Sequence, residues 1–300
     1  MAKLKKSHPN HPLAEVFGYK TTDFSAKAKK SRDEELCMHH NNVPRCTKDK
    51  KDAPLGVCSM YSNGDVVCIC PIRFREGWKI AEDAADFFFG SSKGCTALKE
   101  VRLKEKTGAS AGNIDLVIAK HNSSGKVLDF GAVEIQSVYV SGNIRNPFEY
   151  YMEDPKKRAR MDWSKEKFYP RPDFLSSSRK RLAPQLIYKG QILKAWGKKM
   201  AIVVDRPFFN TLPEINRVDM DKADICWLVY ELKENKSKTK YELTLYEKVY
   251  TSWEDVFKSI ANPAIGDVSE FISILERKLQ PLLHEHTKDH LISVHDWASP

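Results

Sequence analysis

The sequence of 300 residues contains no apolar run that approaches the roughly 20 residues needed to cross a membrane. Its N-terminus, from Met1 to Pro9, is basic and lacks the apolar stretch of a secretory signal peptide. Internal repeats and long low-complexity segments are also missing. We therefore expect a soluble, cytoplasmic protein of one or two domains with no membrane partner.

The composition supports a folded core but does not by itself select a partner. Hydrophobic residues make up 41% of the chain and aromatic residues 10%, which excludes disorder as the main state. The 49 Lys and Arg exceed the 40 Asp and Glu, so the formal net charge is +9. A positive charge of this size is compatible with nucleic acid, an anionic membrane surface or acidic proteins.

The position of the charge is more informative than its total. Residues 142–200 contain 15 Lys and Arg but only 6 Asp and Glu, whereas the rest of the chain is neutral overall. Tyr and Trp residues are interleaved with these cations, a combination that suits a phosphate backbone. The candidate DNA-binding residues are Arg145, Lys156, Lys157, Arg158, Arg160, Arg179, Lys180 and Arg181.

Five of the seven cysteines lie within one stretch of 34 residues, namely Cys37, Cys46, Cys58, Cys68 and Cys70. In a reducing compartment such a cluster is typical of a closed, structural site for Zn²⁺ or iron. We expect Cys37, Cys46, Cys58 and Cys70 to be the ligands, with spacings wider than those of an ordinary zinc finger. Cys68 and Cys70 alternate on a strand and would face opposite sides, so Cys68 is an alternative ligand if the strand is broken. His39 and His40 are further alternatives.

Apolar periodicity predicts alternating helices and strands around one core. The predicted elements are short strands near 66–69, a helix over 80–89, a β-hairpin over 114–136, a helix over 179–197, strands at 201–204, 226–232 and 241–246, and helices over 253–261 and 267–283. This pattern predicts an α/β or α+β fold with a mixed central sheet flanked by helices. We divide the chain into residues 1–95, which contain a small metal-binding subdomain, and residues 96–300, which form the core.

The predicted hairpin contains the candidate catalytic residues. Asp115 lies on its first strand, and Glu134 and Gln136 share one face of its second strand. Two carboxylates that converge beside a sheet repel each other unless a cation joins them, and Mg²⁺ is the natural occupant. Gln136 could orient an attacking water molecule, and Glu100 could supply a further carboxylate. Asp together with Glu-X-Gln is a weak signal when it is taken alone.

These residues resemble those of a known nuclease core. Asp115 followed by Glu134-Ile135-Gln136 is similar to the PD-(D/E)XK motif in a Glu-X-Gln variant. More closely, the chain resembles restriction endonucleases of the NotI/EagI type. The matching stretches are AEVFGY at 14–19, GVCS at 56–59, NGDVV at 63–67, CPIR at 70–73, EIQS at 134–137, SGN at 141–143 and RLAPQ at 181–185.

The resemblance implies a homodimeric, Mg²⁺-dependent type II enzyme that cuts both strands of double-stranded DNA at a specific, palindromic, G·C-rich site. It implies that Asp115 and Glu134 bind Mg²⁺, that Gln136 takes the position most relatives give to Lys, and that Glu100 is the upstream acidic residue. The family's four-cysteine metal site maps onto Cys37, Cys46, Cys58 and Cys70. The resemblance further implies a prokaryotic cytoplasm and a cognate DNA methyltransferase that protects the host DNA.

Two other functions are compatible with the sequence. A non-enzymatic, sequence-specific DNA-binding regulator would use the cysteine site and the basic segment but leave the convergent carboxylates without a role. A structure-specific repair nuclease would share the catalytic core. Incubation of a plasmid with Mg²⁺ distinguishes these functions. Discrete fragments indicate a restriction endonuclease, intact DNA with a gel shift indicates a regulator, and smearing indicates a structure-specific nuclease.

Overall fold

The structure is a computed structural model that describes residues 10–39, 42–50, 52–261 and 265–285. The chain divides into two compact units, residues 1–260 and residues 261–300. None of the helices in the described ranges is long and apolar enough to cross a membrane.

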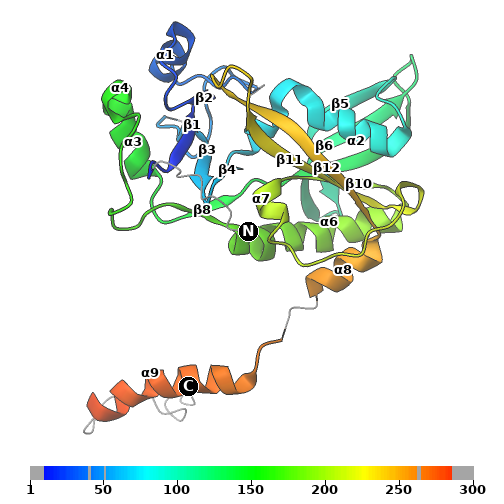
Figure 1. Cartoon of the computed structure of the whole chain (residues 1–300). Helices are drawn as coiled ribbons and strands as arrows, with labels where there is room; N and C mark the ends of the chain where they lie inside the picture. The colour runs from blue at the N-terminus through cyan, green and yellow to red at the C-terminus, as the bar shows by residue number, and fades with distance from the viewer. Residues whose placement is uncertain (1–9, 40–41, 51, 262–264, 286–300) are drawn as a thin grey trace. The chain divides into compact units, whose positions relative to one another are not determined.

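The first unit is built on a six-stranded sheet with strand order β12-β11-β10-β7-β6-β5 (Figure 1). Its strands are β5 (Cys95–Lys104), β6 (Ser110–His121), β7 (Val127–Ile135), β10 (Met200–Asp205), β11 (Ile225–Glu234) and β12 (Tyr241–Thr251). Strands β7, β10 and β11 are parallel, whereas β5, β6 and β12 are antiparallel to their neighbours. The predicted mixed central sheet is confirmed.

Helices cover both faces of this sheet (Figure 1). Helix α2 (Lys79–Phe89) shares a hydrophobic cluster with Ala201 and Val203 of β10. Helices α6 (Ala183–Ala195) and α8 (Trp253–Ala261) pack in another cluster with Met200 and Ile202 of the same strand. Because alternate residues of a strand point to opposite faces, α2 lies on one side of the sheet and α6 and α8 on the other.

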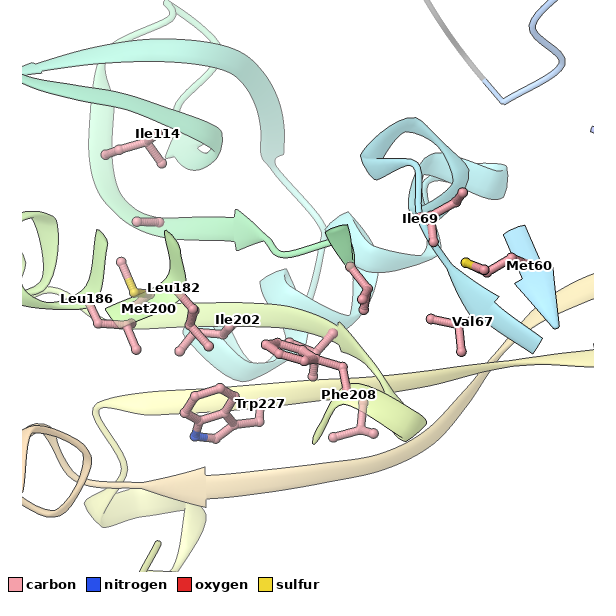
Figure 2. Close-up of a cluster of buried hydrophobic side chains, with 14 of the residues drawn as sticks. Met60, Val67, Ile69, Ile114, Leu182, Leu186, Met200, Ile202, Phe208 and Trp227 are labelled. Atoms are coloured by element: carbon pink, nitrogen blue, oxygen red, sulfur yellow. The ribbon is translucent and has the colours of Figure 1, made fainter. Parts of the chain in front are cut away.

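A smaller antiparallel sheet precedes the central one, with strand order β2-β1-β3-β4. Its strands are β1 (Leu13–Val16), β2 (Tyr19–Lys20), β3 (Val57–Ser62) and β4 (Asp65–Cys68), and helix α1 (Ala26–Asp33) follows β2. Figure 2 shows Met60 and Val67 of this sheet in the same buried cluster as Ile202, Phe208 and Trp227. The two sheets therefore share one continuous hydrophobic core. The domain boundary placed after residue 95 stays a prediction.

The remaining elements connect these layers. They are the strand pair β8 (Tyr139–Ser141) and β9 (Arg171–Asp173), helices α3 (Arg145–Glu153), α4 (Pro155–Arg158), α5 (Phe174–Ser177) and α7 (Arg206–Phe209), 3₁₀ segments at Pro71–Trp78 and Met220–Lys222, and a π-helical turn at Ser178–Leu182. The second unit contains helix α9 (Val268–Glu285).

The sequence patterns predict the main elements to within a few residues. The helix expected over 80–89 is α2, and it ends at Gly90, whose φ of 71° is the left-handed conformation that glycine adopts without strain. The expected hairpin is β6–β7, and the helix expected over 179–197 is the π-helical turn followed by α6, with Pro184 in its first turn. Strand β5 is not predicted, because most of its side chains are exposed and show no apolar alternation.

A buried ion-pair network fastens the small sheet to the edge of the central sheet. The guanidinium of Arg73, which is fully buried, donates to the Glu15 carboxylate over distances of 2.9 and 3.2 Å. It also donates to the Tyr241 carbonyl of β12 at 3.1 Å and to Glu76 at 2.5 Å. The Ser59 hydroxyl donates to Glu15 at 2.8 Å. Charges buried in this way are tolerated only while their partners are present.

We expect Arg73→Met to lower the free energy of unfolding by about 3–5 kcal/mol, because Glu15 would keep a buried charge without its partner. Urea denaturation followed by circular dichroism measures this loss. The control variant Arg217→Met breaks an exposed pair with Glu247 and should lower the free energy of unfolding by less than about 1 kcal/mol. Similar losses in the two variants would contradict a special role of the buried network.

Candidate active site

The hairpin β6–β7 places two carboxylates side by side. Its register pairs Leu116 with Val133, so Asp115 and Glu134 occupy the next opposed positions on the two strands. The Asp115 carboxylate accepts a hydrogen bond from the backbone N–H of Ile135 at 2.7 Å. Glu134 is fully buried within the sheet. The structure therefore brings together the two residues that the sequence nominates as metal ligands.

The electrostatics of this pair favour a bound cation. Burial raises the pKa of Asp115, and burial followed by the negative charge of Asp115 raises the pKa of Glu134 to about 8. Among the described residues, no group of three or more His, Cys, Asp or Glu side chains is arranged to hold a metal ion. Mg²⁺ commonly uses one or two carboxylates and completes its shell with water and phosphate oxygens. The donor set of Asp115 and Glu134 therefore fits Mg²⁺.

A lysine that the sequence analysis does not single out completes the cluster. Lys189 of α6 is 5% exposed, and its Nζ atom lies 2.8 and 2.9 Å from the two carboxylate oxygens of Glu134. Helical spacing places Lys189 on the same face as Leu186 and Leu193, both of which are fully buried. A charged residue on an apolar helix face is the sequence signal that could have indicated it.

Gln136 lies directly after β7, at the entrance to the site. It is 5% exposed, and its backbone N–H donates to the Val203 carbonyl of β10 at 2.9 Å. Its side-chain Nε2 donates to the Ser137 carbonyl at 2.7 Å. These bonds hold the amide group beside the carboxylate pair but bring no positive charge to Glu134.

Glu100 lies on β5, opposite Asp115. Its neighbours Lys99 and Val101 pair with the residues on either side of Asp115. Glu100 is exposed, and its φ of 53° is a left-handed conformation that costs free energy in a residue other than glycine. Among the contacts of the described residues, no hydrogen bond or ion pair joins Glu100 to Asp115 or Glu134. It is therefore a neighbour of the site and not part of its hydrogen-bonded cluster.

A cleft of about 580 Å³ opens beside Asp115, whereas Glu134 is buried behind it and is not part of the lining. The core contributes Asp115, Ile135, Gln136, Ser137, Val138, Tyr139, Val140, Ile144, Arg181 and Gln185 to its lining. Residues 37–70, here called the cysteine segment, contribute Lys48, Asp49, Leu55 and Ile69, and Pro71 follows directly. The cleft thus lies between the β6–β7 hairpin, the start of α6 and the cysteine segment.

One of the predicted DNA-binding cations next to α6 lies at this cleft. Arg181 lines it, and its guanidinium stacks over the Tyr139 ring at 3.9 Å from the ring centroid. Arg179 and Lys180 are exposed in the same π-helical turn. Arg145 begins α3, where it pairs with Asp49 at 2.5 Å and so ties α3 to the cysteine segment.

The second basic cluster lies elsewhere. Lys156, Lys157, Arg158 and Arg160 are on or just after α4, and none of them lines the catalytic cleft. Lys156 lines a separate cavity with residues of α1. Arg158 pairs with Glu153 and stacks over the Tyr150 ring. The structure therefore separates the basic segment into a group at the cleft and a group at α4.

Four of the five clustered thiols share one cavity. Cys37, Cys46, Cys58 and Cys70 line a space of about 230 Å³. Burial raises the pKa of Cys46 to about 11 and also raises the pKa of Cys58, and the nearby charge of Cys70 adds to both shifts. Raised pKa values keep these thiols protonated unless a cation stabilises the thiolates, and among the described residues no three Cys, His, Asp or Glu side chains are already arranged as a metal-binding group. Deprotonated cysteine is a residue type that suits Zn²⁺ or iron.

The fifth thiol and the two histidines differ in position. Cys68 is fully buried in the hydrophobic cluster that contains α2, and its thiol donates to the Cys70 carbonyl at 3.3 Å. It does not line the cavity of the other four. His39 lines that cavity, whereas His40 lies outside the described residues.

Lys48 connects the cysteine cavity to the catalytic cleft. Its side chain belongs to the lining of both, as do Leu55 and Pro71. The Nζ atom of Lys48 donates to the carbonyls of Val57 and Ile69 at 2.8 and 2.9 Å. One wall of the catalytic cleft is thus the outer wall of the cysteine cavity.

Comparison with known families decides the class of this site. The family model of the restriction endonuclease NotI matches residues 15–243, which include the cysteine segment, the hairpin and α6. The chain belongs to the NotI restriction endonuclease family. It is accordingly a DNA-binding nuclease, and the resemblance predicted from the sequence is confirmed. No curated protein matches the chain. The range matched by the family model ends before α8 and α9.

We expect Arg181→Ala to weaken DNA binding by about tenfold, because Arg181 lies at the cleft. The slope of the logarithm of the binding constant against the logarithm of the salt concentration should also become shallower by about one. Fluorescence anisotropy of a labelled duplex between about 50 and 200 mM salt measures both quantities. The control Arg158→Ala removes a cation of the α4 group that is already paired with Glu153, and a smaller change is expected. An equal loss in both variants would contradict the cleft as the main DNA contact.

Proposed function

We propose that the protein is a type II restriction endonuclease that hydrolyses both strands of double-stranded DNA at a specific, palindromic, G·C-rich site, with Mg²⁺ as cofactor. The observation that supports this most strongly is the pair of Asp115 and Glu134 beside a cleft, in a chain of the NotI restriction endonuclease family. Membership of that family also favours an endonuclease over a non-enzymatic regulator.

The residues of the cleft divide the work of phosphodiester hydrolysis. Asp115 and Glu134 would hold Mg²⁺, which supplies a Lewis acid for the phosphate and lowers the pKa of bound water. The amide of Gln136 lines the cleft and orients the attacking water by a hydrogen bond. The water oxygen forms a bond to phosphorus as the bond to one sugar oxygen breaks. Arg181 would clamp a flanking phosphate and so set the register of the DNA.

The proposal includes an assembly and a cellular setting. The core would be a PD-(D/E)XK nuclease core, with the cysteine segment as a small four-cysteine subdomain. Cutting both strands of a palindrome is most simply achieved by a homodimer whose twofold axis coincides with that of the site. Guanine would be read by Arg or Lys in the major groove. A cognate DNA methyltransferase would protect the host DNA in the cytoplasm of a prokaryote.

We expect Glu134→Ala to abolish Mg²⁺-dependent cleavage and to leave DNA binding within a few-fold, because the variant loses a metal ligand but no cleft cation. Plasmid digestion and a gel shift in Ca²⁺ measure the two properties. The matched control is Glu82→Ala, an exposed glutamate of α2. A Glu134→Ala protein that still produces discrete fragments would contradict the assignment, and smeared products from the wild type would favour a structure-specific nuclease.

We propose in addition that Cys37, Cys46, Cys58 and Cys70 bind one structural Zn²⁺ or iron ion, a proposal supported by their common cavity. Purified protein should contain about one equivalent of metal. Cys58→Ser should lower this content by at least about half, whereas Cys68→Ala should leave it unchanged, because Cys68 lies outside the cavity. Elemental analysis gives the answer. Metal-free wild-type protein, or metal loss in Cys68→Ala with Cys58→Ser unaffected, would contradict this ligand set.

A further inference from the structure

Lys189 is built into the site more completely than any other cation near the cleft. Its Nζ atom donates to both carboxylate oxygens of Glu134 and, at 2.5 Å, to the Asn113 carbonyl of β6. An ammonium group has three N–H donors, so all three are used. A lysine that is 5% exposed keeps its charge at low cost only with such complete pairing.

The strand β6 is shaped to admit this side chain. Gly112 has a φ of 102°, and a Cβ atom added there would lie 3.3 Å from Cε of Lys189. A larger residue at position 112 would be strained in its backbone and would press on the lysine stem. Gly112 and the Asn113 carbonyl therefore form a cradle along which Lys189 reaches Glu134.

Strand β7, which carries Glu134, and the residue that follows it provide no positive charge to the Glu134 carboxylate. The residue two positions further on is Gln136, which is neutral and whose Nε2 is bonded to the Ser137 carbonyl. In the described part of the chain, the ion pairs of Glu134 are those with Lys189. The positive charge at this carboxylate is thus delivered from α6, 55 residues away in sequence.

We propose that Lys189 is the positioning residue of the active site: its ammonium orients the Glu134 carboxylate and offsets one of the two negative charges that attract the divalent ion. This rests on the proposed function of Asp115 and Glu134. Two consequences follow from the charge balance. Without Lys189 the pair attracts a divalent cation more strongly. Without Lys189 the Glu134 carboxylate also loses its fixed orientation, and small misplacements at a reacting centre reduce rates strongly.

The test compares Lys189→Met, which keeps the length of the side chain but removes its charge, with wild type. Isothermal titration of DNA-free protein with Mn²⁺ should show binding about tenfold tighter in the variant. Cleavage of a plasmid at saturating Mg²⁺ should be slower by about 10²-fold. The control Lys194→Met removes a lysine of the same helix whose side chain is 41% exposed and should match wild type in both measurements.

Thermal unfolding separates positioning from a merely structural role. A structural loss would lower the melting temperature equally in EDTA and in Mn²⁺, whereas the proposal expects Mn²⁺ to raise it more in Lys189→Met than in wild type. If Lys189→Met does not fold, Lys189→Gln, which keeps N–H donors without the charge, is expected to show the same pattern.

The outcomes distinguish this inference from the proposed function. If wild type cuts DNA and Glu134→Ala does not, the proposed function stands whatever Lys189 does. If, in addition, Lys189→Met binds Mn²⁺ no more tightly than wild type, or cuts at the wild-type rate, the positioning role is overturned. If Glu134→Ala still cuts DNA, both proposals are wrong.

Discussion

Two carboxylates that lie side by side in a sheet repel each other, and the surroundings of the half-buried Asp115 and the buried Glu134 are arranged to tolerate that repulsion. The backbone N–H of Ile135 donates to Asp115, and the ammonium of Lys189 pairs with both oxygens of Glu134. The first contact forms within the hairpin, but the second depends on long-range packing, because α6 must lie against the sheet for Lys189 to reach β7. The hydrophobic cluster that contains Leu193 of α6 and the strands beneath it therefore has a direct electrostatic purpose. The packing of one helix decides whether the site can exist without a bound cation.

The cleft depends on a second constraint, which is the attachment of the small sheet and the cysteine segment to the core. Arg73 and Glu15 form a buried ion pair that reaches β12, and Arg145 of α3 pairs with Asp49 of the cysteine segment. These contacts hold the segment against the catalytic hairpin, so that it forms one wall of the cleft. A shared hydrophobic core, visible in Figure 2, adds to this attachment. The cysteine segment and the β6–β7 hairpin consequently form one structure around the cleft.

Much of this architecture can be predicted from the sequence, because amphipathic alternation is a local property. The hairpin that carries Asp115 and Glu134 follows from alternation on both sides of a glycine turn, and α2 follows from its apolar face and Gly90. Contacts between distant segments are not encoded in this way. Lys189 belongs to the basic segment 142–200 but was not among the candidate DNA-binding residues, and only its position on the buried face of α6 marks it as different. Glu100 was expected near the site, but the exposed strand β5 that carries it escaped prediction, since β5 has almost no buried face to produce a pattern.

Lys48 has a consequence for how proteins of this kind can be altered. Its side chain lines both the cysteine cavity and the cleft. Its ammonium donates to the carbonyl of Val57, at the start of β3, and to that of Ile69, directly after β4. A chimera that exchanged the cysteine segment for that of a relative would therefore also exchange part of the lining of the cleft. The cysteine cavity and the cleft share this wall, so neither can be redesigned as an independent module.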